Sequence, residues 1–585
     1  MLEDRRLLAV YTWDGAHDAS GTSADTNWMT AENWVGDVRP GAGDDLVFPS
    51  GAAGLANIND FPANTNFGGI LISGSNYHFS GNAIELAAGI SSQGTNNTFV
   101  IYVMLTAPQG IGQSVSGTFT VNSVIDLNGN DLSISTANSS GTTLLTGSIR
   151  GSGNVSTGGS GTTALAARND YGGVTTVNAG TLAVRHAEAL GAADGLAGTG
   201  TELAANATLR LENNITVVDE LLSITAGNVF FASEGVNVWT GDVSGSGTTS
   251  LFLRSSTGST LQIDGNVTTS DYLEVYVFGG GKAVLNGPTN SSSRLYVQNA
   301  NTNLELNGTL TTLYTNSIQS GATLSGNGTN FTGASYGTQI LNTSRLNPGT
   351  LSGTGILHTE DVNFQSGSHF DVLLNGTDAG TQHDQLDVAG TVSLAGNLSF
   401  SFGPTPIVLG ALYKIIDNDG TTDAVVGTFA GLSQNAVFSA GVQTFQISYT
   451  GGDGNDVVVE AITGSPVVEG AATDDDFNLR RNGNVIELRN HGTLIYDSPL
   501  GVIQPFGLTI NGGDGDDTLT IDYATGGYFS LDVAFNGDTN MTSHGDKLIV
   551  TGGTFSNATS TFTFANSGTI MLDTGSGNLD DRPPD

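Results

Sequence analysis

Short runs of alternating apolar and polar residues recur along the chain, among them GTLAV, ATLRL, STLQI and NLELN. Alternation with a period of two residues is typical of half-buried β-strands, and the chain shows no sustained helical period. Gly, Asn, Thr and Ser gather between these runs and indicate turns. The pattern therefore predicts a chain that is nearly all β.

A recurring turn-and-strand unit organises residues 52–461. Gly-Thr-Leu closes a turn and enters a strand at Gly180–Leu182, Gly308–Leu310 and Gly349–Leu351. Glycine accepts the positive φ of a tight corner, and the residues after it begin the next sheet face. Residues 384–459 continue with DQLDVAG, YKIIDNDG, VVGTFAGL and ISYTGGDGNDVVV. Repeats of about 20 to 25 residues, each burying its apolar face against its neighbours, predict a β-solenoid body.

Two segments of this body resemble known repeats. Tyr171–Val184, YGGVTTVNAGTLAV, closely resembles the autotransporter-associated β-strand repeat. Leu346–Val459 is similar to the C-terminal end of passenger-like repeats in planctomycete-type exported proteins. The resemblances imply a right-handed parallel β-helix on a bacterial surface protein.

The first fifty residues form two parts. LEDRRLLA, within residues 1–10, resembles the L-E-x-R-x-L-L-A signature of large exported planctomycete-type proteins, with Asp4 where that pattern often has Pro. The resemblance implies an export segment. Residues 11–51 hold three of the four Trp residues. This density predicts a cap over the open first coil, because an uncovered solenoid end is an unpaired sheet edge. The alternative is a carbohydrate-stacking platform.

The C-terminal part has a different organisation. Residues 462–473, ITGSPVVEGAAT, have the composition of a linker. Strand-like pieces in residues 474–577, such as NVIELRN and DKLIVTGGTF, predict a second, smaller β-solenoid or β-sandwich. Residues 578–585, NLDDRPPD, predict a disordered tail.

Composition narrows the choice of partners. The formal net charge is −38, from 55 acidic and 17 basic residues. This charge argues against nucleic acid and against anionic membrane surfaces, because both need cationic neutralisation. The chain has no Cys, which excludes disulfides and thiolate ligands. Its apolar runs are all too short for a membrane-spanning helix, which argues against membrane insertion. Many carboxylates favour an extracellular divalent cation, calcium above all.

Two nonapeptides match the G-G-x-G-x-D-x-U-x pattern of calcium-binding β-rolls: residues 451–459 and 512–520. In that pattern glycines let carbonyl and Asp oxygens converge on one hard cation. The candidate ligands of a structural Ca²⁺ are Asp514, Asp516, Asp517, Asp453, Asn455 and Asp456. Turns at Asn536–Asp538 and Gly545–Asp546 complete the second site if they stack beside it. The alternative is an ordinary Gly-Asp turn whose carboxylates cap backbone N–H groups.

Other polar clusters have structural explanations. His383-Asp384 and His544-Gly545-Asp546 each precede a strand beginning D-x-L or D-K-L, and equivalent coil corners explain this echo better than a catalytic pair. The charge run Asp474–Asp476 predicts a solvated face. The sequence also lacks the His-Glu-x-x-His, G-x-S-x-G and Walker motifs.

These observations favour a non-enzymatic extracellular structural or adhesive protein, on the surface of a bacterium or in its matrix. Its β-helix would be calcium-stabilised and would self-associate into a layer or filament, bind other surface proteins, or contact glycans. The alternative is a polysaccharide lyase or glycosidase, since right-handed β-helices host both functions. A groove with three or more carboxylates and an Arg would favour the enzyme.

Overall fold

The computed structural model describes residues 9–15, 25–332, 337–420, 423–441, 443–462, 467–504, 507–537, 545–564 and 567–574. Within these ranges the protein is nearly all β, with one short 3-10 turn, η1 (Ala31–Asn33), and one short α-helix, α1 (Leu500–Ile503). The all-β prediction is confirmed. Neither helical piece is long and apolar enough to cross a membrane. Most of the export-type segment (residues 1–8) and the predicted tail 578–585 lie outside the described ranges.

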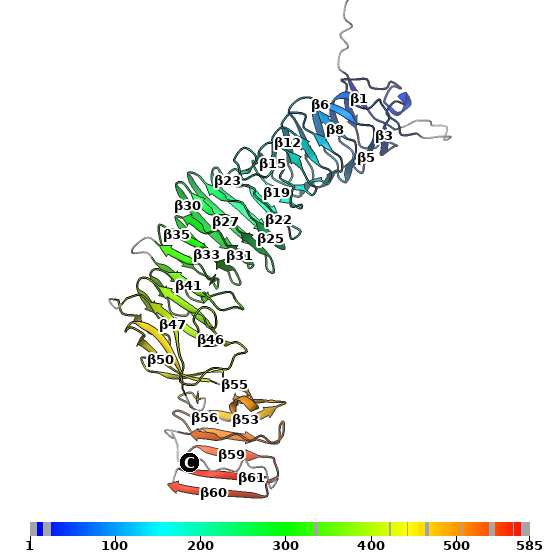
Figure 1. Ribbon diagram of the computed structural model, residues 1–585. Helices are drawn as coiled ribbons and strands as arrows, with labels where there is room; N and C mark the ends of the chain where they lie inside the picture. The colour runs from blue at the N-terminus through cyan, green and yellow to red at the C-terminus, as the bar shows by residue number, and fades with distance from the viewer. Residues whose placement is uncertain are drawn as a thin grey trace, which may run out of the picture. The chain divides into compact units, whose positions relative to one another are not determined.

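The chain divides into two compact units. Unit 1 comprises residues 1–372, 384–398 and 417–430, and unit 2 comprises residues 373–383, 399–416 and 431–585. Unit 1 is a β-solenoid whose coils stack as parallel strands (Figure 1). The predicted solenoid is therefore confirmed.

Four sheets run along the solenoid of unit 1, built from parallel strands that pair from coil to coil. The first contains β1 (Val10–Thr12), β2 (Asp45–Phe48), β4 (Thr65–Ile72), β6 (Ile84–Ser92), β9 (Gln109–Gln113), β12 (Leu132–Thr136), β15 (Val155–Gly159), β18 (Thr175–Val177), β20 (Thr201–Leu203), β23 (Leu222–Ile224), β26 (Val243–Gly245) and β29 (Val267–Thr269). In this sheet β6 pairs with β9 and also with the first strand of a side branch that contains β8 (Val103–Leu105), β11 (Ile125–Asp126), β14 (Ile149–Gly151) and β17 (Asp170–Tyr171). The second contains β3 (Ala56–Asn59), β5 (His78–Gly81), β7 (Asn97–Phe99), β10 (Gly117–Val121), β13 (Gly141–Leu145), β16 (Thr162–Leu165), β19 (Thr181–Val184), β21 (Thr208–Leu211), β24 (Gly227–Ser233), β27 (Thr248–Ser255), β30 (Tyr272–Phe278), β33 (Arg294–Val297), β36 (Asn316–Ile318), β39 (Thr338–Ile340), β42 (Val362–Phe364) and β45 (Val392–Leu394). The third contains β22 (Thr216–Val217), β25 (Val236–Trp239), β28 (Thr260–Ile263), β31 (Lys282–Leu285), β34 (Asn303–Leu306), β37 (Thr323–Gly326) and β40 (Arg345–Pro348), and the fourth contains β32 (Thr289–Ser292), β35 (Thr309–Thr312), β38 (Thr329–Thr332), β41 (Ile356–Thr359) and β44 (Gln385–Val388).

The core of unit 1 consists of apolar columns that run from coil to coil. One such column takes one buried residue from each of ten successive strands of the second sheet. Every member of the column is at most 4% exposed. The members are Leu182, Leu209, Phe231, Leu253, Val277, Val297, Ile318, Ile340, Phe364 and Leu394. Burying one such side chain contributes roughly 1.5–3 kcal/mol. The period-two pattern of the sequence therefore places the buried apolar residues of each strand in register with those of the next coil.

The Trp-rich segment covers the N-terminal end of unit 1. Residues 26–28 run along the edge of β3, where Ile58 accepts the backbone N–H of Trp28 at 2.9 Å. The rings of Trp13, Trp28 and Trp34 surround Phe48, with ring centroids 5.7 to 5.9 Å from its centroid. The predicted cap is confirmed, and it satisfies the first free strand edge of the second sheet.

Glycines at one corner of unit 1 let neighbouring coils touch. A Cβ on Gly265 would lie 2.0 Å from the carbonyl oxygen of Gly241, and a Cβ on Gly287 would lie 2.4 Å from that of Gly265. The same contact recurs for Gly308, which faces Gly287 at 1.8 Å. The corner therefore admits no side chain, and one methyl group would push two backbones apart.

We expect Gly287→Ala to destabilise the chain by about 1–3 kcal/mol, because the new Cβ meets backbone that cannot rotate away. Urea unfolding followed by circular dichroism measures this loss. Gly172→Ala is the matched control, since a Cβ there has no heavy atom within 4 Å, and its effect should stay within about 0.5 kcal/mol. Equal effects of the two variants would contradict the corner-contact explanation.

Unit 2 contains a smaller parallel stack. β52 (Val467–Glu469), β56 (Leu508–Asn511) and β58 (Val533–Asn536) form one sheet, and β53 (Asp476–Asn482), β57 (Thr518–Asp522) and β59 (Lys547–Thr551) form another. Two antiparallel strands, β54 (Val485–Asn490) and β55 (Thr493–Pro499), extend the second sheet. Of the two predicted alternatives, these coils are a solenoid. In the predicted linker, residues 463–466 lie outside the described ranges, and β52 occupies Val467–Glu469.

Candidate functional site

Three aspartates line up at one corner of unit 2, one immediately before each strand of the parallel stack. Asp475 precedes β53, Asp517 precedes β57 and Asp546 precedes β59, and these strands pair in register. A glycine stands earlier in each turn, at Gly470, Gly512 and Gly537, and an added Cβ there would lie 2.0 to 2.3 Å from an oxygen of the aspartate of its own turn. We call Asp475, Asp517 and Asp546 the acidic corner.

Two carboxylates of the acidic corner bind the backbone of the preceding coil, and the third binds within its own turn. Asp517 Oδ1 accepts the backbone N–H of Asp475 at 2.7 Å, and Asp546 Oδ1 accepts the backbone N–H of Asp517 at 2.9 Å. Asp475 Oδ2 accepts the N–H of Ala471 at 2.7 Å. The predicted stacking of the Gly545–Asp546 turn beside the 512–517 turn is therefore observed. Asp538 and His544 lie outside the described residues.

Asp517 is the least satisfied member of the acidic corner. Its side chain is 0% exposed, and its Oδ2 has no hydrogen-bond partner among the residues that the structure describes. Burial raises the pKa of this carboxyl, and the nearby charges of Asp475, Asp546 and Asp474 raise it further, against the lowering effect of the bond from the Asp475 backbone. A buried carboxylate beside three others is costly unless a positive charge balances it, and a hard divalent ion would supply that charge.

The other predicted ligands of this turn are placed differently. Asp514 is exposed and Asp516 is half-buried, while the backbone N–H of Asp516 donates to Asp474 Oδ1 at 2.9 Å. Among the residues that the structure describes, no three acidic or His side chains already converge on one point. A cation at this corner would therefore combine Asp517 with backbone oxygens or with rotated neighbouring carboxylates.

The first nonapeptide forms the turn of an antiparallel hairpin between β50 (Gln443–Gly451) and β51 (Asp456–Ile462). Asp453 is exposed, whereas Asn455 and Asp456 are buried. The Asp456 carboxylate lies 3.4 Å from the Nζ atom of Lys414, in β47 (Leu412–Asn418). Because this lysine already balances the charge of Asp456, the hairpin turn fits a calcium ion less well than the acidic corner does.

His383 and Asp384 occupy a coil corner. His383 is 2% exposed, its Nε2 lies 3.3 Å from the carbonyl oxygen of Lys414, and its ring packs edge-on against Tyr413. Burial lowers the pKa of His383 and favours the neutral ring. Asp384 Oδ1 accepts the backbone N–H of Gly355 at 2.9 Å. These contacts are those of a structural corner.

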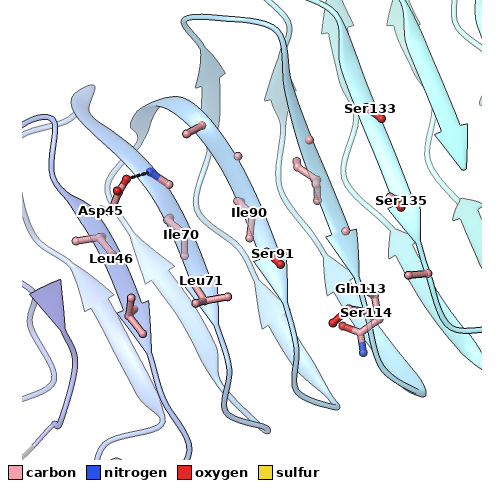
Figure 2. Close-up of a pocket in the computed structure, with 18 of the residues that line it drawn as sticks. Asp45, Leu46, Ile70, Leu71, Ile90, Ser91, Gln113, Ser114, Ser133 and Ser135 are labelled. Atoms are coloured by element: carbon pink, nitrogen blue, oxygen red, sulfur yellow. Dashed lines mark hydrogen bonds between the residues drawn. The ribbon is translucent and has the colours of Figure 1, made fainter. Parts of the chain in front are cut away.

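A shallow hollow lies on the outward face of the first sheet of unit 1 (Figure 2). It has a volume of about 650 Å³, and small or hydroxyl-bearing residues from β4, β6, β9 and β12 line much of it. Ser91, Ser133 and Ser135 present hydroxyl groups there, and Asp45 Oδ1 accepts the backbone N–H of Gly69 at 2.6 Å. Asp45 is the only titratable residue of its lining.

A second hollow of about 420 Å³ follows on the same sheet, between β12 and β20. Two carboxylates line it, Asp131 and Glu202, and Asp131 Oδ1 accepts both the backbone N–H and the side-chain N–H of Asn154 at 2.9 and 3.0 Å. Neither hollow has the three carboxylates and the Arg that would favour a polysaccharide-cleaving enzyme.

The carbohydrate-stacking alternative for the Trp-rich segment is wrong. Trp13, Trp28 and Trp34 are each 0% exposed, so no ring face is open to a sugar. Their indole N–H groups donate within the cap, to the Gly54 carbonyl, the Asn57 side chain and the Trp28 carbonyl, at 2.7 to 2.8 Å.

Two features escaped sequence interpretation. The run Asp474–Asp476 was expected on a solvated face, but Asp475 is 4% exposed. Asp475 follows Gly470 at the same spacing at which Asp517 follows Gly512. This repeated spacing is the sequence signal that could have shown that the two aspartates occupy equivalent turns. Glu220, in VVDELLS, is 0% exposed inside unit 1, and nothing in its flanking residues marks it.

No protein-family model matches the chain, and no curated protein sequence matches it.

Proposed function

We propose that this protein is a non-enzymatic extracellular scaffold of a bacterial surface or matrix, of the planctomycete-type exported class, with an adhesive or assembly role. The observation that carries the proposal is that basic residues of unit 1 form ion pairs between adjacent coils, which is a structural use of these side chains. Arg150 pairs with Asp126 at 3.1 Å, Lys282 with Glu305 at 2.5 Å and Arg345 with Asp371 at 2.7 Å, each across adjacent coils. The resemblance to passenger-like repeats and the acidic, cysteine-free composition support the extracellular location.

Intact cells of the source bacterium test the location. Antibody against the chain should label unbroken cells, and brief protease treatment of those cells should remove the label. A signal that appears only after lysis would contradict the proposal. A cytoplasmic protein detected in the same samples controls for leakage.

A polysaccharide panel tests the non-enzymatic role. We expect the purified chain to bind surface polysaccharides or wall fragments without releasing reducing ends or unsaturated sugars. Product that accumulates with time and enzyme concentration would overturn this part and favour the lyase or glycosidase alternative. The hollow with Asp131 and Glu202 would then be the first place to mutate.

We further propose that calcium stabilises unit 2 at the acidic corner. The donor set fits a hard cation, because the ligands offered by these turns are oxygens and Asp517 Oδ2 is buried with no partner in the described part of the chain. Calcium there would neutralise the repulsion among Asp474, Asp475, Asp517 and Asp546 and so join three coils.

Asp517→Asn should reverse its effect on stability when calcium is added. In chelator we expect the variant to be at least as stable as the wild type, because the substitution removes a buried charge. In calcium at about 100 times the dissociation constant, the wild type should gain about 2.7 kcal/mol that the variant lacks. Thermal unfolding with chelator, calcium or magnesium measures both, and Asp453→Asn, in the hairpin turn, is the control. If calcium does not change the thermal unfolding of the wild type, the proposed site is refuted.

A further inference from the structure

The last described element of unit 2 is an isolated hairpin. β60 (Asn557–Phe564) and β61 (Ser567–Asp573) pair antiparallel, from Asn557 opposite Asp573 to Phe564 opposite Ser567. In the described part of the chain neither strand pairs with any other strand. The hairpin therefore presents two open edges of backbone N–H and C=O groups.

Little in unit 2 supports this hairpin. Its residues 556–561 and 568–571 are exposed, including Ile570 at 44% and Met571 at 47%. The nearest ring contact is Phe555, just before β60, which packs on Tyr523 and Tyr528 with centroids 5.6 and 6.5 Å apart. A two-stranded hairpin is marginal in water by itself, and further strands are what stabilise it.

The hairpin has only one of the features that normally protect an edge, a register shift between Phe562 and Phe564, close to its turn. Residues 556–574 hold one charged side chain, Asp573, no Lys, no Arg and no Pro, in a chain that carries 55 acidic residues. Its Thr, Ile and Phe residues favour strands. Natural edge strands are usually protected by Lys, Pro or bulges. A partner that approaches these edges therefore meets a single charge in the two strands, that of Asp573 at the end of β61.

The chemistry of the edge selects the partner. Residues 575–585 of the same chain contain three Asp and two Pro, so they are a poor source of a third strand. An antiparallel strand edge is complementary to a copy of itself across a two-fold axis. A near-neutral strand from a second copy also meets none of the repulsion that two acidic surfaces would create.

We infer that the hairpin β60–β61 is the docking surface for a second copy of this chain, which adds its own hairpin edge to edge to make a four-stranded antiparallel sheet. This inference deepens the scaffold proposal by naming the partner of its assembly surface. It concerns the purified chain alone, so a failure of the surface-labelling experiment would leave its test intact.

The first test is the mass of the full-length chain by light scattering and sedimentation over a range of concentrations. We expect a concentration-dependent dimer for the wild type. Thr569→Lys places a charge on the exposed face of β61 and should shift the chain to monomer by at least tenfold in dissociation constant. Thr311→Lys, on an exposed position of β35, is the matched control and should dimerise like the wild type.

A second test does not depend on disrupting the hairpin. Because the chain has no Cys, Met571→Cys carries a single thiol, and a short bismaleimide should link two copies only where hairpins meet. Thr311→Cys should stay unlinked. A wild type that remains monomeric at every concentration overturns the inference, and so does a dimer that Thr569→Lys leaves unchanged or that Met571→Cys does not link.

Discussion

Glu220→Gln should abolish a large pH dependence of stability in unit 1. Glu220 lies between β22 and β23 with its side chain 0% exposed. Its Oε1 accepts a hydrogen bond from the Thr201 hydroxyl at 2.7 Å, and its Oε2 has no hydrogen-bond partner within the described ranges. Burial raises the pKa of Glu220 from 4.5 to about 8, with a further contribution from Asp194 and an opposing one from Thr201.

The direction of the effect follows from this rise. The protonated side chain fits the interior better than the charged one. Its contribution to the free energy of unfolding is therefore fully present below pH 4.5, declines as the pH rises and is lost above about pH 8. At about 1.4 kcal/mol per pH unit, the loss is on the order of 5 kcal/mol. The glutamine variant keeps the acceptor for Thr201 and cannot ionise, so this component of the pH dependence should be absent from it.

Urea unfolding at pH 5, 7 and 9 measures the difference between the two chains. We expect similar midpoints at pH 5 and a clearly higher midpoint for Glu220→Gln at pH 9. Glu188→Gln removes an exposed carboxylate, 2.7 Å from Arg168, and should retain the pH dependence of the wild type. A wild type with equal midpoints at pH 5 and pH 9 would show that Glu220 is solvated in the folded protein.

Trp28→Ala should destabilise the cap at the N-terminal end of unit 1. The ring is 0% exposed and packs on Phe48 and Phe67 with centroids 5.7 Å apart, and its Nε1–H donates to Asn57 Oδ1 at 2.8 Å. Truncating a buried Trp costs about 3–5 kcal/mol. It also leaves the buried Asn57 side chain without its donor.

Hydrogen exchange followed by mass spectrometry locates this loss. Amides of β2 and β3 should exchange faster in Trp28→Ala, while those of β27 and β30 should keep the protection of the wild type, because solenoid coils depend mainly on their neighbours. Val35→Ala, which truncates a side chain that is 60% exposed, is the control. Uniform loss of protection through all of unit 1 would contradict a local cap.

The parts of the fold that depend on local pattern could be predicted from the sequence. Alternation in strands such as Thr208–Leu211 and glycine corners such as Gly308 are short-range signals, and they predicted the solenoid. The density of Trp residues in 11–51 is equally local, and it predicted the cap. The candidate site depends on which turns stack. Asp475 and Asp517 are 42 residues apart, and only the register of β53 against β57 brings them together.

The burial of single polar residues was not predictable for a related reason. Asp474 and Asp475 are neighbours in one acidic run and both lie at the corner between coils, yet only the second is buried. For Glu220 the corner positions of later coils are glycines, at Gly241, Gly265 and Gly287, so the repeat itself gives no expectation of a carboxylate. In both cases the side chain's surroundings come from other coils.

The unbroken register of the column from Leu182 to Leu394 constrains how the length of unit 1 can change during evolution. Loss or duplication of one complete coil leaves every remaining residue opposite an equivalent partner, and changes the length of the stack by one strand spacing of about 4.8 Å. Loss of a single residue within a strand reverses the inward and outward faces after it. We therefore expect the length of unit 1 to differ between related proteins by whole coils.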